Sequence, residues 1–259
     1  MLHFKRLIAL SSALVLCCSS AFAAKKSNPE YTAREITTDI VQDIPAAIQQ
    51  MLDYAYEQLI ETDGKNLKEK NKFTKWRNNY TFEWCGGFVT WCMLEAGIPM
   101  EEKNRIQDGE VEGLFHVKEA GVGKLYDGYA RLNRITRVPQ KGFIIVYGNE
   151  GSGGSTPYYH VGLVYDVEKL ENGLYRITSI EGNVKGHTIR MYTRDYDLNL
   201  ASDKKQKKND MPLVPEEERD REETNIFSYG YAYTKKHMYI TIFLMPWIPE
   251  DPQETAAEE

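Results

Sequence analysis

The chain has 259 residues, 42% of them hydrophobic, and a formal net charge of −6 at pH 7. This length and apolar content suffice for one sizeable domain with its own core, whereas two full domains would be cramped. An acidic chain of this kind is a poor passive binder of nucleic acid or of an anionic membrane surface, so we expect neither partner.

The first 23 residues have the pattern of a secretory signal peptide. Basic residues 5–6 precede an apolar run over 7–16, and small residues at 21–23 offer a cleavage site. A run of about 10 residues is roughly half of what a membrane-spanning helix needs, and the leucine before Cys17 disfavours a lipoprotein signal. We therefore expect an exported protein, periplasmic or secreted and without stable membrane insertion.

A polar N-terminal extension over residues 24–61 is expected to follow the signal peptide. Apolar residues recur at helical spacing from Ile40 to Glu61, which predicts one amphipathic helix that packs on the rest of the protein. Residues 65–80 are polar and basic, with two aromatic interruptions, and predict a loop.

The next predicted helix contains Cys85 and Cys92, the two cysteines that remain after the expected cleavage. The segment WCGGFVTWCMLEAG is typical of a helix that ends near Gly97 and Pro99. Seven residues on a helix are about 10.5 Å apart along the axis, whereas a disulfide needs Cα atoms closer than about 7 Å. Because an exported protein normally oxidises such a pair, two thiols that cannot join indicate that at least one has a chemical role.

The second half of the chain predicts an antiparallel sheet. Residues 110–130 are predicted to be helical first and then loop-like, because three glycines interrupt the run. From residue 142 the period changes to that of strands, with a hairpin connection at Asn172-Gly173. The predicted strands read FIIVYG, HVGLVYDV, GLYRITSIEGN and HTIRMYT. Helices followed by such a sheet form an α+β fold.

The C-terminal part of the chain is strongly charged. Residues 201–224 contain a basic block followed by an acidic block, which predicts a solvated insertion. Residues 225–247 are predicted to return as a closing hairpin, and residues 251–259 to form an acidic tail.

Cys85 has the features of a nucleophile. It lies in the first turn of its predicted helix, where unpaired backbone N–H groups and the positive end of the helix dipole favour a thiolate. Gly86 and Gly87 follow it and would leave room for a substrate backbone. The alternative is that Cys85 is a buried small hydrophobe, which is what we expect of Cys92 among its apolar neighbours.

A cysteine nucleophile needs a base within hydrogen-bond reach. His160 begins the strand HVGLVYDV directly after a loop rich in glycine and serine, so it can face a cleft at the edge of the sheet. His116 on a predicted helix, His187 on a late strand and His237 in a polar stretch are expected to be structural or solvated.

Glu181 and Asn183 lie at the end of a predicted strand. Because side chains alternate along a strand, both are expected on the same side of the sheet. A carboxylate and an amide placed there could accept a hydrogen bond from one imidazole nitrogen and orient the ring. Either residue could equally be a turn residue at the end of the strand.

Four segments, in this order, resemble the CHAP family of cysteine, histidine-dependent amidohydrolases and peptidases. They cover roughly residues 70–190 and read NKFTKW, EWCGGFVTWCMLEAGIP, YYHVGLVYDV and SIEGNV. The most specific parts are Trp84-Cys85, His160 to Gly162 and Glu181 to Asn183.

This resemblance implies a papain-like α+β fold, with N-terminal helices on an antiparallel sheet, in a catalytic domain over residues 62–250. It further implies that Cys85 attacks a carbonyl, that His160 shuttles the proton, and that Glu181 and Asn183 occupy the third and fourth polar positions. The implied substrates are amide bonds of peptidoglycan, either between the sugar lactyl group and the peptide or within the peptide and its cross-bridge. We expect no cofactor, and no metal either, because paired Cys or His spacing typical of zinc sites does not occur.

One segment departs from the family pattern, and two other functions stay open. The family commonly has Pro-Gly-Asp before its central strand, whereas this chain has Pro139-Gln140-Lys141-Gly142-Phe143 and lacks the acid. The proposed site residues Cys85, His160, Glu181 and Asn183 could also serve an amidase that acts on another small amide. They could also belong to a catalytically silent protein that binds wall peptide.

Overall fold

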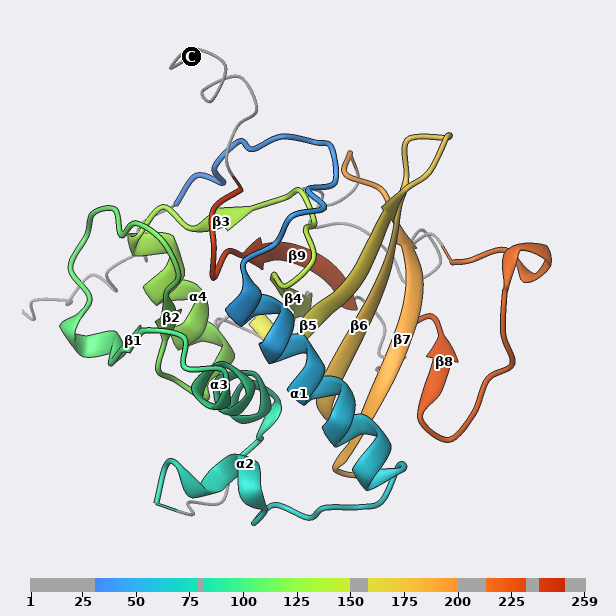
Figure 1. Cartoon of the computed structure of the whole chain (residues 1–259), viewed down its shortest axis with the longest axis horizontal. Coiled ribbons are helices and arrows are strands. Elements are labelled where there is room, and N and C mark those ends of the chain that lie inside the picture. The colour runs from blue at the N-terminus through green and yellow to red at the C-terminus, as the bar shows by residue number, and fades with distance from the viewer. Residues whose placement is uncertain (1–30, 79–81, 150–157, 200–212, 232–237, 250–259) are drawn as a thin grey trace, which may run out of the picture. The chain divides into compact units, whose positions relative to one another are not determined.

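The computed structural model describes residues 31–78, 82–149, 158–199, 213–231 and 238–249 (Figure 1). The predicted signal peptide, the acidic tail, His237 and residues 201–212 of the insertion lie outside these ranges. Within them, none of the helices combines the length and apolar character that crossing a membrane requires.

A mostly antiparallel sheet forms the centre of the unit that begins at residue 31. Its strands are ordered β3-β9-β4-β5-β6-β7-β8, and each neighbouring pair is antiparallel except β7 and β8. All four predicted strands are present, and the predicted α+β fold class is confirmed. The strands are β3 (Ile135–Thr136), β9 (Met238–Leu244), β4 (Ile144–Asn149), β5 (Tyr158–Lys169), β6 (Tyr175–Val184), β7 (Thr188–Tyr196) and β8 (Phe227–Tyr229).

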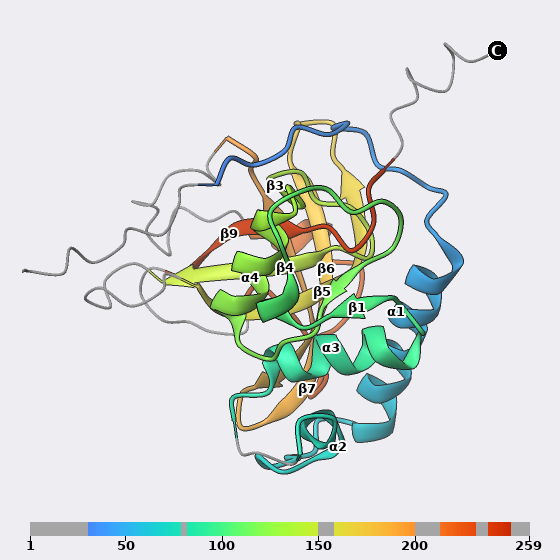
Figure 2. The ribbon, with the colours of Figure 1, turned by 90° about the vertical axis from the view of Figure 1, so that its left-hand side faces the viewer.

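Three helices pack against this sheet, α1 (Ala46–Thr62), α3 (Cys85–Glu95) and α4 (Val122–Arg131). Helix α1 crosses β6 and β7, and α3 lies against β5 and β6 (Figures 1 and 2). The predicted helix of the N-terminal extension therefore exists and packs on the core. It begins later than predicted, after Pro45, because a residue that precedes proline is disfavoured in the helical region.

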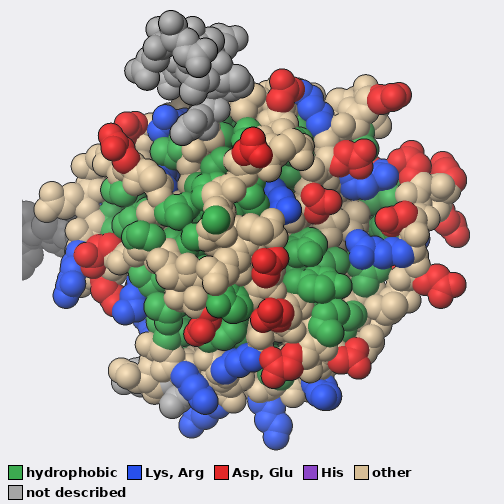
Figure 3. Space-filling model, viewed as in Figure 1, with side chains coloured by type: hydrophobic (Ala, Val, Ile, Leu, Met, Phe, Trp, Pro, Cys, Tyr) green, Lys and Arg blue, Asp and Glu red, His purple; other side chains and the backbone are tan. Residues whose placement is uncertain are grey.

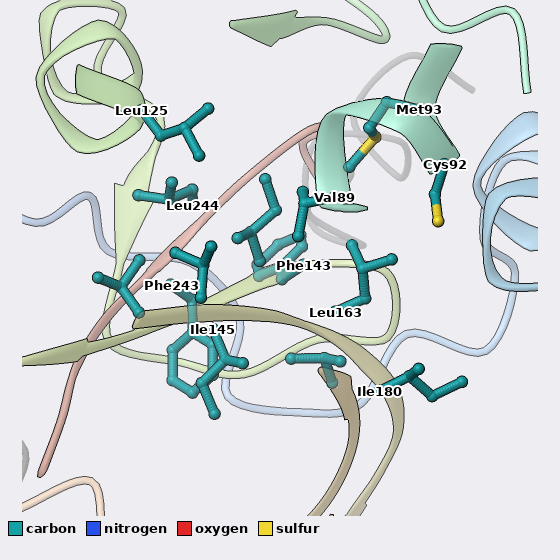
Figure 4. Close-up of a cluster of buried hydrophobic side chains, with 14 of the residues drawn as sticks. Val89, Cys92, Met93, Leu125, Phe143, Ile145, Leu163, Ile180, Phe243 and Leu244 are labelled. Atoms are coloured by element: carbon teal, nitrogen blue, oxygen red, sulfur yellow. The ribbon is translucent and has the colours of Figure 1, made fainter. Parts of the chain in front are cut away.

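The packed face of α3 carries one of the two cysteines. Figure 4 shows Cys92 with Val89 and Met93 of α3, above Leu163 of β5 and Ile180 of β6. Cys92 is fully buried, and this burial raises the pKa of its thiol well above the ordinary value. The prediction that Cys92 is a core residue is confirmed.

The loop predicted over residues 65–80 contains one short helix, α2 (Lys72–Lys75). Asn71 caps it, since its side-chain oxygen accepts a hydrogen bond from the Phe73 N–H at 2.9 Å. The Thr74 hydroxyl accepts in turn from the Asn71 N–H at 3.3 Å, which completes a capping box. On the face drawn in Figure 3, Lys and Arg side chains gather along the edge where α2 lies, and charges of both signs are interspersed elsewhere.

The order predicted for residues 110–130 is wrong. The strand β2 (His116–Val117) comes first and pairs in parallel with β1 (Met100–Glu101), and α4 follows it. Glycine breaks a helix only where nothing compensates for it. A Cβ atom on Gly128 would lie 2.8 Å from both methyl groups of Val117, so the glycine allows α4 to approach β2 closely.

The prediction of a closing hairpin is also wrong, because β8 and β9 are not neighbours. Strand β8 adds to β7 in parallel, whereas β9 inserts between β3 and β4. The described part of the charged insertion, residues 213–224, is mostly exposed apart from Val214 and contains the 3-10 turn Glu216–Glu218. A second 3-10 turn, Lys103–Arg105, follows β1.

Candidate active site

Three of the four predicted site residues line one pocket of about 370 Å³. Cys85 is the first residue of α3, His160 lies on β5, and Asn183 lies near the end of β6. The fourth, Glu181, lies behind His160 and is completely buried. The fold thus brings together side chains that are up to 98 positions apart. The remaining lining residues are Glu83, Tyr159, Lys185, Gly186 and His187.

Cys85 lines the pocket, and only 4% of the residue is exposed. Trp84 precedes it at the N-cap of α3 and is fully buried, stacked on Phe73 with ring centroids 5.4 Å apart. This stacking anchors the start of the helix, whose first N–H groups have no partners within the helix. A sulfur in this position lies at the positive end of the helix dipole.

His160 connects the sulfur to a carboxylate. Its Nε2 atom lies 2.9 Å from Oε2 of Glu181, which leaves Nδ1 as the nitrogen that can face Cys85. Burial lowers the pKa of His160, but hydrogen bonds with Cys85 and Glu181 raise it by more than burial lowers it. The resulting pKa is about 9. The imidazole is therefore positively charged at neutral pH.

Glu181 is held by a set of donors that the sequence did not indicate. Its Oε1 atom accepts hydrogen bonds from the Tyr147 hydroxyl at 2.7 Å, the Ser179 hydroxyl at 2.6 Å and the Arg194 guanidinium at 2.8 Å. One oxygen of the carboxylate thus binds three donors, and the other faces His160. Tyr147 is the cross-strand partner of His160, so the register of β4 and β5 brings it here.

Asn183 belongs to the pocket wall. Its Nδ2 donates to the carboxylate of Glu83, and its Oδ1 accepts from Nδ1 of His187 at 2.8 Å. The regular alternation that we assumed for β6 ends here, because the register shifts between Gly182 and Val184 and Asn183 has a φ of 60°. The predicted role of Asn183 in orienting the imidazole remains a prediction.

The sequence had indicated that His187 lies on a strand, but the structure places it elsewhere. It lies in the turn between β6 and β7, with a φ of 66°, and lines the pocket beside Asn183. Three consecutive residues of this turn, 185–187, have positive φ angles. No helix or strand periodicity identifies a residue in such a turn, so sequence reasoning missed its place at the site.

Comparison with known families adds to this geometry. The model of the CHAP domain family matches residues 76–183, a segment that contains Cys85, His160, Glu181 and Asn183. The chain contains a CHAP domain. At the level of the family, this domain indicates a peptidoglycan-related amidase or peptidase, and CHAP domains are typically hydrolases. No curated protein and no solved structure matches the chain.

Two glycines in the CHAP motifs allow side chains to reach the site. A Cβ atom on Gly162 would lie 2.5 Å from Cγ of Glu181, and one on Gly182 would lie 2.6 Å from Cβ of Phe88. Gly86 after the cysteine has a similar role, since its Cβ would lie 2.2 Å from the carbonyl oxygen of Ala120. Protein atoms therefore fill the room that we had assigned to substrate at Gly86.

At the position where the chain departs from the CHAP pattern, Gln140 binds the N-terminal extension. Gln140 is fully buried, its Oε1 accepts from the Val41 N–H at 3.0 Å, and its Nε2 donates to the Asp39 carbonyl at 2.7 Å. Gly142 has a φ of 83°, and a Cβ there would lie 2.1 Å from Cγ2 of Ile48. This turn of the CHAP domain therefore holds the N-terminal extension.

The second buried histidine, His116, is structural, as predicted, although it lies on β2 and not on a helix. It is fully buried between the Thr90 and Tyr129 hydroxyls, and burial lowers its pKa to about 3. In the part of the chain that the structure describes, no group of three or more His, Cys, Asp or Glu side chains is placed to hold a metal ion.

Proposed function

We propose that this chain is an exported cysteine amidase or peptidase that hydrolyses amide bonds in peptidoglycan peptide. Cys85 is the nucleophile and His160 is the base. The observation that carries the proposal is the hydrogen-bonded series Cys85, His160, Glu181, which begins in the pocket lining and ends at a buried carboxylate. The CHAP match supports the class of substrate, and the predicted signal peptide supports export.

The proposed reaction is acyl transfer in two steps. The Cys85 thiolate attacks the amide carbonyl, and the His160 imidazolium gives its proton to the leaving amine as the C–N bond breaks. A water molecule then attacks the thioester, His160 takes a proton from that water, and the sulfur leaves as a carboxylic acid is released. The backbone N–H of Cys85 at the start of α3 stabilises the oxyanion formed in each step.

Glu181 and Asn183 have different places in this mechanism. Glu181 accepts the hydrogen bond from Nε2 of His160, so the ring keeps Nδ1 toward the sulfur. Asn183 joins Glu83 to His187 and so shapes the wall of the pocket. The lining includes Glu83 and Lys185, two residues of opposite charge, which suits a peptide that bears charges of both signs, as stem peptides do.

Digestion of purified peptidoglycan by the mature chain, followed by mass analysis of the released fragments, tests the proposal. Each cut exposes one new amine and one new carboxyl group, and the fragment masses identify the bond. Cys85→Ala should lower the rate by about 10⁴-fold or more, because the covalent step disappears. Cys92→Ala, a matched change on the same helix, should retain activity within a few-fold.

Other outcomes of this experiment would contradict the proposal in distinct ways. Fragment release by Cys85→Ala at a rate close to that of the unmodified chain would exclude Cys85 as the nucleophile. Binding of the unmodified chain to peptidoglycan without any cleavage would identify a silent wall-peptide binding protein. Cleavage of a small γ-glutamyl amide but not of peptidoglycan would place the activity on another substrate.

A further inference from the structure

The carboxylate of Glu181 is completely buried, and its ionisation requires compensation. An isolated charge in a protein interior is strongly disfavoured, and a carboxyl group without a counter-charge takes up a proton instead. Tyr147 and Ser179 donate hydrogen bonds to Oε1 but bring no positive charge. The remaining donor, Arg194, is the one that brings a positive charge from behind the carboxylate.

Arg194 lies on β7 and is itself fully buried. Its Nη2 atom donates to Oε1 of Glu181 at 2.8 Å and to the Ser179 hydroxyl at 2.6 Å. The guanidinium carbon lies 5.3 Å from the ring centroid of Tyr147 and 5.1 Å from that of Tyr231, distances at which cation–π attraction stabilises a cation. Burial lowers the pKa of Arg194 to about 10, so the side chain is still charged at neutral pH.

When the His160 ring is neutral, the ionisation state of Glu181 decides which of its nitrogens carries the proton. A carboxylate only accepts hydrogen bonds, so it requires a proton on Nε2 and leaves the Nδ1 lone pair for the Cys85 proton. A carboxylic acid would donate its own proton to Nε2. The neutral ring would then carry its proton on Nδ1 and could not accept one from the thiol.

We infer that Arg194 is a positioning residue of this site, which keeps Glu181 ionised and thereby sets the tautomer of His160. The inference deepens the proposed acyl transfer and rests on it. Arg194 does not touch the pocket and acts through Glu181 alone. The groups that face the pair of Glu181 and His160 are Cys85 from α3, Tyr147 from β4, Ser179 from β6, Arg194 and Tyr192 from β7, and Tyr231 from the segment before β9.

A double-mutant cycle separates this role from a general contribution to folding. Arg194→Met should lower kcat by on the order of 10²- to 10⁴-fold with little change in KM, as a wrong histidine tautomer does in serine proteases. Glu181→Gln replaces the carboxylate by a neutral acceptor that needs no counter-charge. The double variant should therefore be no slower than Glu181→Gln alone, within about threefold.

Two further variants control the cycle. Arg194→Lys keeps a positive charge beside Glu181 and should recover at least tenfold of the loss seen with methionine. Arg176→Met removes a guanidinium from the adjacent strand β6, where it pairs with Asp195 at 2.8 Å and Glu218 at 2.6 Å, away from the site. Its activity should stay within threefold of the unmodified chain. Losses that multiply in the double variant, or equal losses for Arg194→Met and Arg176→Met, would overturn the inference.

A measurement that needs no substrate tests the inference independently of the proposed function. The Cys85→Ala background lacks one of the two hydrogen bonds that raise the pKa of His160. In this background, nitrogen-15 NMR of histidine-labelled chain, recorded at a pH where the ring is neutral, reports which ring nitrogen of His160 carries the proton. We expect Nε2 with Arg194 present and Nδ1 with Arg194→Met at the same pH. A proton on Nε2 in both variants would refute the inference. Failure of the chain to cleave peptidoglycan would contradict the proposed function while leaving this result intact.

Discussion

Two histidines of this protein are buried to the same degree and differ in charge. His116 is 0% exposed and His160 is 1% exposed. Burial lowers the pKa of His116 to about 3, whereas that of His160 is raised to about 9 because hydrogen bonds to Cys85 and Glu181 exceed the effect of burial. Burial alone therefore does not decide the protonation state of either residue.

The partners of each ring explain the difference. The Thr90 hydroxyl gives its proton to the Glu119 carbonyl at 2.6 Å, so its oxygen accepts from Nε2 of His116. The hydroxyl of Tyr129 donates to Nδ1, and the neutral ring is satisfied by neutral groups. His160 instead lies between a thiol and a buried carboxylate, both of which can carry negative charge. A reactive histidine is thus recognised by ionisable neighbours and not by its depth in the fold.

The largest expected effect comes from replacing each ring by glutamine. His160→Gln should lower the rate of peptidoglycan cleavage by about 10⁴-fold or more, since an amide cannot take the thiol proton. His116→Gln should leave the rate within a few-fold but lower the free energy of unfolding by about 1–3 kcal/mol, because it disturbs buried hydrogen bonds. Rate assays and urea denaturation of both variants measure the contrast. Equal loss of activity in the two variants would remove the distinction between the sites.

The contributions of the two histidines to the stability of the fold should change with pH in opposite directions. His160 has a folded pKa above its unfolded value near 6.5, so its charged form stabilises the fold fully below pH 6.5, and this contribution is lost as the pH rises through about 9. His116 has a folded pKa below that value, so its contribution is present above pH 6.5 and is lost as the pH falls toward about 3.

Histidine-labelled NMR between pH 4.5 and 8 measures this difference directly. Throughout this range His160 should remain protonated and His116 should remain neutral. Titration of both rings near pH 6.5 would show that the environments do not differ as the structure indicates. Activity should also decline above about pH 9, as His160 loses the proton that the leaving amine requires.

The smallest expected effect concerns one glycine beside each histidine site. Gly162→Ala places a Cβ against Glu181, and Gly128→Ala places one against Val117, next to His116. Both should lower the free energy of unfolding by about 1–3 kcal/mol, as overpacking does. Only Gly162→Ala should also lower kcat, because it displaces the carboxylate that holds His160. A normal kcat in folded Gly162→Ala would show that the position of Glu181 tolerates this displacement.

Local patterns were sufficient to predict the helix with Cys85 at its start, the strand with His160 and the α+β class. A helix start and a run of strand residues depend on neighbours in the chain, which the sequence displays directly. The order of elements over residues 110–130 was predicted wrongly because Gly128 of α4 serves a contact with β2. That contact is made through space, and no local pattern records it.

The support behind Glu181 could not be predicted for a similar reason. Tyr147 reaches the carboxylate because β4 pairs with β5 in one register, and Arg194 reaches it because β7 pairs with β6 in another. A shift of one residue in either pairing would turn these side chains to the other face. The register shift beside Asn183, which brings His187 to the pocket, is likewise a property of the paired strands.

The anchoring of residues 39–41 by Gln140 bears on where this protein can be truncated. The segment that matches the family begins at residue 76, but the turn before the central strand closes around Ile48 and is tied to Asp39. A fragment that starts at residue 76 would lose α1 and leave the surface of β6 and β7 that α1 covers open to water. The smallest piece expected to fold on its own therefore starts before Asp39, well upstream of the boundary that the family match suggests.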